Sequence, residues 1–258
     1  MIGVGVVGAT GKMGREVCRA VGDADDLILA GAISRTAAGQ RLGDVIGIEG
    51  PDGDVVLVER LDDLAAANVQ VMVDFSAAAY APEHVAWAIA HGINVVEGTT
   101  GFPIDPAWED APVGVFVAPN FAIGAALMMR FAEQAARLLD AAEVIELHHD
   151  RKADAPSGTS IATAGRIGRA RAGAWVSPGG DDAHPGARGA DLSGVRVHSV
   201  RLPGLLAHQE VIFGGPGETL TIRHDSTDRA SFMPGVLMAI RAVGDRPGLT
   251  VGLDTLLG

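Results

Sequence analysis

Cysteine is nearly absent, since the chain of 258 residues has only Cys18. A single cysteine cannot form a disulfide within the chain, which favours a protein of a reducing compartment. The first residues, MIGVGVVGATG, have no basic segment followed by a long apolar stretch, and no apolar run reaches the roughly 18 residues that a membrane span needs. We therefore expect no signal peptide, no membrane span and a cytoplasmic location.

Positive charge is also scarce, because 20 Lys and Arg residues stand against 32 Asp and Glu residues and give a net charge of −12. Such a surface repels nucleic acid and anionic membranes, so neither is expected as a partner. A small anion can still bind in a local cationic pocket. Hydrophobic residues make up 48% of the chain and charged residues 20%, which predicts packed cores, and the length suits two small domains.

Lysine is the rarer basic residue, since Lys12 and Lys152 are the only lysines among the 20 basic residues and the other 18 are arginines. A lysine ammonium is compact and can release a proton, whereas an arginine guanidinium stays charged. A chain that uses arginine for fixed charge therefore favours a chemical role where it keeps a lysine. The alternative is chance, because two lysines have to stand somewhere.

The N-terminal residues have the pattern of a dinucleotide-binding unit. A β-branched apolar strand over 2–7 is followed by GATGKMG at 8–14 and by a helix over 15–21. Glycines in such a turn let backbone N–H groups approach a pyrophosphate at the positive end of the helix. The spacing is GxxGxxG rather than the usual GxGxxG, and a tight turn without a ligand is the alternative.

The next predicted strand, 27–33, ends at Ser34 and Arg35. An NAD site usually has Asp or Glu at this position, where the carboxylate binds the ribose hydroxyls. A carboxylate would repel the 2′-phosphate of NADPH, whereas an arginine beside a hydroxyl can bind it. We therefore expect NADPH to be preferred and NADH to be possible; the alternative is that Arg35 is a solvated loop residue.

Further predicted strands over 69–75, 93–96 and 113–118, with a helix over 82–91, continue an alternating β-α pattern. The carboxyl ends of parallel strands form the ligand-binding edge of an open sheet. The turns after the last two strands are therefore expected at the nicotinamide half of a dinucleotide, although ordinary turns would look the same. Their residues are Gly98, Thr99, Thr100, Ala118, Pro119, Asn120 and Phe121.

The second half of the chain changes from alternating β-α units to a series of strands, which predicts a second domain. The fold class is thus α/β, with an N-terminal Rossmann-type domain and a smaller α+β substrate and oligomerisation domain that has a mixed, largely antiparallel sheet. The domains are expected at 1–121 with 235–258, and at 122–234. The predicted helices cover 122–139, 159–172 and 232–243, the predicted strands cover 144–147, 195–200, 209–213 and 219–224, a long loop covers 173–194, and 249–257 is expected to pack on the first domain.

The segment HHDRKADAPSGTS at 148–160 concentrates the chemical groups after a predicted strand. His148, His149 and Lys152 supply positive charge and transferable protons. Ser157 to Thr159 open a helix, whose free N–H groups can bind a carboxylate. We expect no metal here, because adjacent side chains of a strand point in opposite directions and no further ligand spacing is present. A polar surface loop is the alternative.

The chain resembles the dihydrodipicolinate reductase family of bacterial lysine and diaminopimelate synthesis over nearly its whole length. The intact His-His-x-x-Lys-x-Asp-x-Pro-Ser-Gly-Thr pattern is the most specific part of this resemblance. The segments that carry it are GATGKMG at 8–14, DFS at 74–76, GTTGF at 98–102, APNFAIG at 118–124, ELHHDRKADAPSGTS at 146–160 and GETLTIRHDSTDRASFMPGV at 217–236.

The resemblance implies hydride transfer from NADPH or NADH to an unsaturated cyclic dicarboxylate, in a homotetramer built through the second domain. His148 would be the catalytic proton donor or acceptor, and Lys152 a second donor. The dicarboxylate would be bound by His149, Lys152, Gly158 and Thr159, and the pyrophosphate by Gly8, Ala9, Thr10, Gly11, Lys12 and Met13. Many members of the family have an acidic residue where this chain has Ser34, which argues against efficient use of NADH.

Two other functions stay open at this point. The first is a different oxidoreductase of the same fold, such as an aspartate-semialdehyde or homoserine dehydrogenase. The former needs a nucleophilic cysteine, and Cys18 stands in the first predicted helix, away from the expected site. The second is a non-catalytic NADPH-sensing protein, which would have no use for His148 and Lys152 beside an anion-binding turn.

Overall fold

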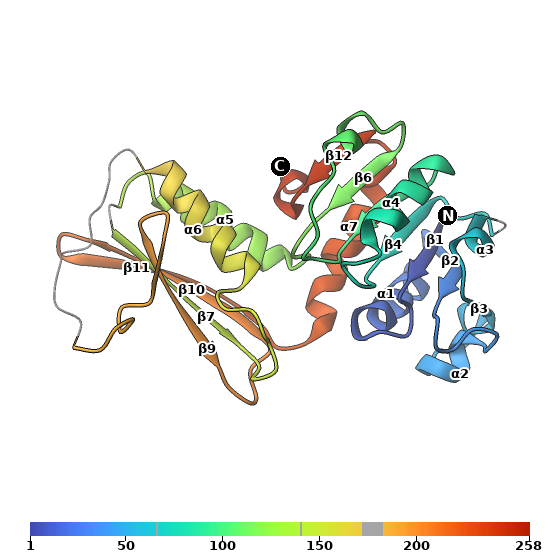
Figure 1. The fold of residues 1–258 in the computed structure, drawn as a ribbon, viewed down its shortest axis with the longest axis horizontal. Helices are drawn as coiled ribbons and strands as arrows, with labels where there is room; N and C mark the ends of the chain where they lie inside the picture. The colour runs from blue at the N-terminus through green and yellow to red at the C-terminus, as the bar shows by residue number, and fades with distance from the viewer. Residues whose placement is uncertain (66, 140, 172–182) are drawn as a thin grey trace. The chain divides into compact units, whose positions relative to one another are not determined.

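The computed structural model describes residues 1–65, 67–139, 141–171 and 183–258, which form two compact units. The first unit is Met1–Phe121 together with Phe232–Gly258, and the second is Ala122–Ser231 (Figure 1). No helix in these ranges is long and apolar enough to cross a membrane.

In the described part of the first unit, seven strands form a parallel sheet in the order β12-β6-β5-β4-β1-β2-β3. The chain builds the sheet outward from β1 in one direction and then in the other, so the order reverses between β1 and β4. Ligands of such sheets bind at the carboxyl ends of the strands near this reversal. The strands are β1 (Ile2–Val7), β2 (Leu27–Ile33), β3 (Leu57–Val58), β4 (Val71–Asp74), β5 (Asn94–Glu97), β6 (Gly114–Val117) and β12 (Gly248–Val251).

The central strands of this sheet are apolar along nearly their whole length, which is typical of a parallel sheet buried on both faces. Met72 of β4, Val95 of β5 and Val115 of β6 belong to one hydrophobic core with residues of the neighbouring helices. The helices are α1 (Lys12–Gly22), α2 (Leu42–Ile46), α3 (Leu61–Ala65), α4 (Ala81–Ala90) and α7 (Met233–Val243), with short 3-10 turns η1 (Pro51–Asp54), η2 (Pro106–Asp110) and η4 (Leu253–Leu256). A further 3-10 turn, η3 (Arg229–Phe232), lies where the chain passes from the second unit back to the first.

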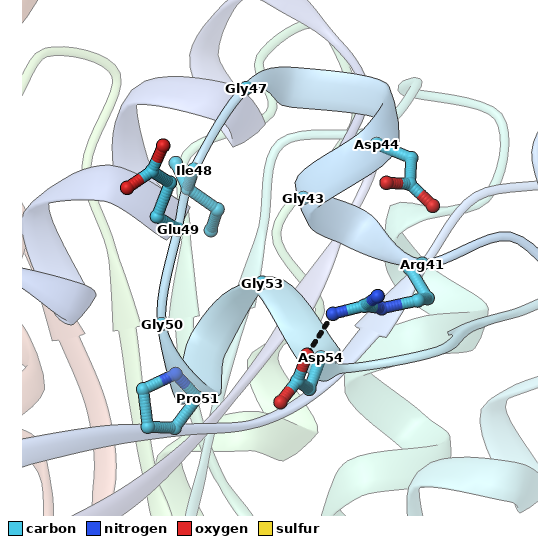
Figure 2. A pocket seen from close by; sticks show the side chains of 10 residues that line it. All are labelled: Arg41, Gly43, Asp44, Gly47, Ile48, Glu49, Gly50, Pro51, Gly53 and Asp54. Carbon is cyan, nitrogen blue, oxygen red and sulfur yellow. Dashed lines mark hydrogen bonds and ion pairs between the residues drawn. The ribbon is translucent and has the colours of Figure 1, made fainter.

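The first two strands have the predicted bounds, and the prediction that 249–257 packs on the first unit is confirmed, because β12 pairs with β6. Helix α1 begins three residues earlier than predicted, with Gly11 as its N-cap. Between β2 and α3 the chain folds around a surface pocket of about 680 Å³. Figure 2 shows the Arg41 side chain reaching Asp54, its ion-pair partner, and none of the predicted site residues lines this pocket.

The second unit contains a mixed sheet, described as five strands in the order β11-β10-β7-β9-β8, in which β7 and β9 are parallel and the other pairs antiparallel. Its strands are β7 (Ala141–His148), β8 (Ala190–Leu192), β9 (Val195–Arg201), β10 (Ala207–Gly215) and β11 (Glu218–Ser226). Helices α5 (Ile123–Ala135) and α6 (Gly158–Ala170) lie side by side on one face (Figure 1). Alternate residues of β7 point to that face, so Ala142 and Val144 are buried beneath the helices and Glu146 follows them.

The predicted loop over 173–194 is wrong at its end, because 190–192 forms β8, while 172–182 lie outside the described residues. Strand β8 pairs with β9 through the two-residue turn Ser193-Gly194, and both turn residues have positive φ angles of 56° and 76°. Two positive φ angles are typical of the type I′ turn that joins antiparallel strands. The strand is too short to show an alternating pattern, so the sequence prediction missed it.

Two carboxyl groups are buried side by side in the first sheet. Asp74 and Glu97 are register partners at the carboxyl ends of β4 and β5, and both are fully buried. Asp74 accepts a hydrogen bond from the Ser76 N–H at 2.7 Å and pairs with His84 Nδ1 at 2.5 Å. Glu97 accepts a bond from the Thr99 N–H at 2.6 Å. Burial, with the negative charge of Asp74, raises the pKa of Glu97 to about 8, so this carboxyl keeps its proton at neutral pH.

We predict that Glu97 makes the free energy of unfolding fall as pH rises from 4.5, the ordinary pKa of the group, to about 8. In this range the unfolded chain releases the Glu97 proton and the folded chain retains it, so the folded state binds more protons and loses stability as pH rises. Glu97→Gln should remove this slope. The measurement is urea unfolding of both proteins between these pH values, with Glu109→Gln, at an exposed site of the same unit, as a control that keeps the wild-type slope. Parallel pH dependence of the wild type and Glu97→Gln would contradict the prediction.

Candidate active site

The glycine turn after β1 is shaped by close backbone contacts. Gly8 has a positive φ of 76°, and a Cβ atom at this position would lie 2.8 Å from the Phe75 carbonyl oxygen. A Cβ atom at Gly14 would lie 2.1 Å from the carbonyl oxygen of Gly8. Only glycine fits both positions, and Gly11 caps α1 between them, so the backbone is open at the positive end of this helix. The turn therefore has the geometry of a pyrophosphate cradle.

A pocket of about 490 Å³ lies where β1, β2, β3 and β4 end, beside the reversal of strand order. Of the residues predicted to bind the cofactor, five line it: Gly8, Thr10, Gly11, Ser34 and Arg35. Ala9, Lys12 and Met13 do not line it, because Ala9 is fully buried behind the turn and the other two lie on α1. Several other lining residues were not predicted from the sequence: Glu59, Leu61, Phe75, Tyr80, Glu83 and His84.

Ser34 and Arg35 have different positions in this pocket. Ser34 is buried, and its hydroxyl lies 2.8 Å from the Thr10 hydroxyl, which ties the end of β2 to the glycine turn. Arg35 is exposed, and its guanidinium carbon lies 4.5 Å from the centre of the Tyr80 ring. Stacking on an aromatic face restricts a guanidinium while leaving its edge available for hydrogen bonds. The cationic edge is thus presented to the pocket.

The two turns predicted at the nicotinamide half follow neighbouring strands. The Ala118 N–H donates to the Glu97 carbonyl at 3.1 Å, so Gly98 to Thr100 and Ala118 to Phe121 begin side by side. Phe75 joins them to the glycine turn, because a Cβ atom at Gly98 would meet its ring at 2.1 Å and its ring packs edge-on against Phe121 with centroids 5.7 Å apart. The first unit therefore brings the three predicted cofactor segments to one edge of its sheet.

In the second unit, β7 ends at His148, whose Nδ1 is hydrogen-bonded to Glu146 Oε2. Glu146 is fully buried and also binds Arg201, whose two terminal nitrogens reach Oε2 at 2.9 Å and Oε1 at 2.8 Å. Burial alone would raise the pKa of Glu146, but hydrogen bonds from His148, Arg201 and Ser199 outweigh it and lower the pKa to about 2. A permanently ionised carboxylate thus stands behind His148.

Lys152 lies in the loop that follows, and its ammonium binds both carboxylate oxygens of Asp154, at 2.7 and 2.8 Å. The hydrogen bond from Lys152, together with its charge, lowers the pKa of Asp154. The Asp154 carbonyl accepts a further bond from Arg201 at 2.6 Å, so the loop is tied to the buried Glu146. The lysine is therefore held near the end of β7 by the carboxylate of an exposed residue.

Ser157 caps α6, with its hydroxyl 3.2 Å from the Ser160 N–H. Gly158 follows at an exposed position, and a Cβ atom there would meet nothing within 4 Å. Behind the cap, Ser160 donates to Gln209 at 3.0 Å, and Gln209 donates to Thr163 at 2.8 Å, all of them buried. This network fixes the start of α6 on the sheet and leaves its positive end open to an anion.

His149 completes the group. Burial is the main cause that lowers its pKa, and the nearby charges of Arg151 and Arg229 add to the effect. Its Nδ1 atom is buried and has no hydrogen-bond partner among the described residues. A buried, unpaired ring nitrogen beside two guanidinium groups is suited to a polar anionic ligand. Arg229 belongs to none of the predicted site residues, and only its basic charge in the segment HDSTDR could have indicated it.

Among the described residues, no three His, Cys, Asp or Glu side chains gather as a metal ion would require. The second unit instead brings His148, His149, Lys152 and Gly158 to the region between the end of β7 and the start of α6. The second unit thus groups side chains that can donate protons beside the start of a helix, while the first unit has a pocket beside its glycine turn.

Comparisons with known proteins agree over both units. Residues 2–121 match the family model for the N-terminus of dihydrodipicolinate reductase, and residues 124–257 match the model for its C-terminus. The 4-hydroxy-tetrahydrodipicolinate reductase of Nocardia farcinica is 51% identical over 266 residues, which cover 99% of this chain and 98% of that protein. The enzyme of the same name from Cutibacterium acnes is 49% identical, over 100% of this chain and 99% of that protein.

A solved structure gives the same result. The dipicolinate-bound dihydrodipicolinate reductase from Paenisporosarcina sp. TG-14 matches with a TM-score of 0.85 and 38% identity, and the match covers 99% of each chain. Since both halves of the chain match the family models and full-length relatives share about half of its residues, the chain belongs to the dihydrodipicolinate reductase family.

Proposed function

We propose that the chain reduces 4-hydroxy-tetrahydrodipicolinate to tetrahydrodipicolinate with NADPH, in diaminopimelate and lysine biosynthesis. The observation that carries the proposal is the grouping of His148, Lys152 and His149 beside the open start of α6, in a member of this reductase family. The direct test mixes the protein with NADPH and substrate generated in place from pyruvate and aspartate semialdehyde by the synthase. Loss of the reduced-nicotinamide absorbance that depends on both protein and synthase is expected, and no loss would contradict the proposal.

The first unit fits a dinucleotide. The glycine turn has no room for a Cβ atom at Gly8 or Gly14, which supports close approach of a pyrophosphate to its backbone. We propose that residues 8–13 hold the pyrophosphate and that Gly98 to Thr100 and Ala118 to Phe121 hold the nicotinamide side. When bound, the cofactor supplies the hydride. The chain's own residues position it and exclude water from one edge of the sheet.

The second unit supplies protons and binds the dicarboxylate. Hydride addition leaves negative charge on the substrate, and a positioned proton donor stabilises this charge in the transition state. His148 is the proposed donor and Lys152 the second one. We propose that His149, Lys152, Gly158 and Thr159 hold the carboxylates, and that a substrate carboxylate displaces Asp154 from the Lys152 ammonium, because the two compete for the same hydrogen-bond donors.

The alternative dehydrogenase with a nucleophilic cysteine is disfavoured by the position of Cys18. This thiol is fully buried in α1, and burial raises its pKa to about 12. A nucleophile requires the thiolate, which such a pKa keeps protonated at neutral pH. A NADPH-sensing protein would need the first unit alone, and the proton-donating groups of the second unit argue against it. We further propose a homotetramer, as the resemblance implies, and a cytoplasmic location, which the single cysteine favours.

The preference for NADPH is supported by the positions of Ser34 and Arg35. The hydroxyl of Ser34 brings no negative charge to the pocket, and Arg35 presents its guanidinium there from the face of Tyr80. A phosphate accepts two parallel hydrogen bonds from such a group. Glu59 also lines the pocket and is a carboxylate that could bind ribose hydroxyls, which supports NADH as a second cofactor.

We predict that Arg35→Ala raises the KM for NADPH by roughly ten- to a hundredfold and changes the KM for NADH little, because only NADPH has a phosphate for the guanidinium to bind. Arg41→Ala, in the other pocket of the same unit, should change neither value. Initial-rate kinetics with both cofactors provide the measurement. An equal rise in KM for the two cofactors would show that Arg35 does not bind the 2′-phosphate of NADPH.

We predict that Lys152→Arg and Lys152→Ala both lower kcat by ~10²–10⁴, with unchanged affinity for NADPH, because neither variant retains an easily released proton. If Lys152 only bound a carboxylate, the arginine would recover much of the substrate KM and leave kcat nearly intact. His148→Gln should show a loss of similar kind. Steady-state kinetics of the three variants distinguish proton donation by Lys152 from carboxylate binding alone. A Lys152→Arg enzyme with wild-type kcat would contradict proton donation by Lys152 and leave His148 as the donor.

A further inference from the structure

A buried carboxylate, that of Glu146, lies beside Nδ1 of His148, although the proposed reaction does not itself require a negative charge there. Glu146 is fully buried under α6, two residues before His148 on the same face of β7. Its Oε2 atom faces the His148 Nδ1 atom, and Arg201 holds both carboxylate oxygens from the neighbouring strand β9. Ser199, the register partner of Glu146 on β9, adds its hydroxyl.

We propose that Glu146 is a positioning residue that acts through His148 and makes Nε2 the atom that transfers the proton. This inference rests on the proposed function of His148. An ionised carboxylate has no hydrogen to donate, so the hydrogen of its bond with His148 belongs to Nδ1 in both the neutral and the charged imidazole. The remaining nitrogen, Nε2, has no hydrogen bond to any described residue and alone gains or loses the proton.

Arg201 keeps the Glu146 carboxylate ionised and facing His148. Its guanidinium donates one bond to each oxygen of Glu146 and a third to the Asp154 carbonyl, so the carboxylate cannot rotate away from His148 without losing them. A carboxylate that is held ionised behind an imidazole fixes the tautomer and stabilises the imidazolium, and removal of its charge favours the other tautomer. In this geometry Nδ1 of His148 holds the ring in place through its bond with Glu146, and Nε2 is left for proton transfer.

The first experiment needs no variant at Glu146. The intact protein is labelled with ¹⁵N-histidine, and the His148 signals are assigned by their loss in His148→Gln. In the neutral form of wild-type His148, the Nδ1 signal should have the shift of a protonated ring nitrogen and Nε2 that of an unprotonated one. The opposite pattern would overturn the proposal, even if variants at the buried Glu146 failed to fold.

The second experiment compares matched variants. Glu146→Gln should remove the negative charge that stabilises the His148 imidazolium and lower kcat by ~10²–10⁴, with the substrate KM within about threefold. Glu143→Gln is the control, because Glu143 stands on the same strand and pairs with His198 at 3.0 Å, but both side chains are partly exposed. It should keep the wild-type kcat within about twofold.

A double variant separates positioning from general structural damage. If Glu146 acts through His148, adding Glu146→Gln to His148→Gln should change kcat by no more than about threefold, whereas independent effects would multiply. A multiplied loss, or a Glu146→Gln enzyme that changes only the substrate KM, would contradict the role of Glu146. Wild-type protein that consumes no NADPH with the substrate would contradict the proposed function instead, and the two failures are therefore distinguishable.

Discussion

The buried charge of Glu146 is the constraint on which the candidate active site depends. A carboxylate that is removed from water is strongly destabilising unless hydrogen-bond donors replace the lost solvation. These donors come from His148 on the same strand and from Arg201 on the next strand, and Arg201 also binds the carbonyl of Asp154. The ends of β7 and β9 and the loop that contains Lys152 are therefore one hydrogen-bonded unit. The orientation of His148 follows from this single buried anion, and through Arg201 the anion also ties down the loop that contains Lys152.

In the first unit, the Glu97 carboxyl is buried as fully as that of Glu146 but has the opposite protonation state. Glu97 accepts one backbone hydrogen bond and has the anionic Asp74 beside it, so burial and repulsion raise its pKa to about 8. Glu146 has a guanidinium, an imidazole and a hydroxyl around it, and its pKa is about 2. The number and charge of the surrounding donors, rather than the depth of burial, decide which carboxyl is ionised. The chain thus places a neutral acid in its cofactor-binding sheet and a fixed anion behind its proposed proton donor.

The sequence was sufficient where local pattern determines structure. Strands 2–7 and 27–33 are continuous apolar runs that end in turn residues, and they have the expected bounds. Residues 36–65 yielded no prediction, because their helices and strand are at most five residues long and too short to show a period. The proposed proton donors were found because they share one segment. Arg201, which holds the buried Glu146, was not found, because it stands 55 residues after Glu146 and reaches it only through the pairing of two strands, which no local pattern encodes.

The different tasks of Arg201 and Lys152 follow from the same geometry. Arg201 makes four hydrogen bonds in fixed directions, two to Glu146 and one each to the carbonyls of Val200 and Asp154. An ammonium has three donors and no planar fork, so a lysine there could not hold both carboxylate oxygens and the loop together. Lys152 differs, since its ammonium binds an exposed carboxylate among the described residues, the one that we propose a substrate displaces. A permanent charge that organises the site requires arginine, and a charge that changes partners and can release a proton requires lysine.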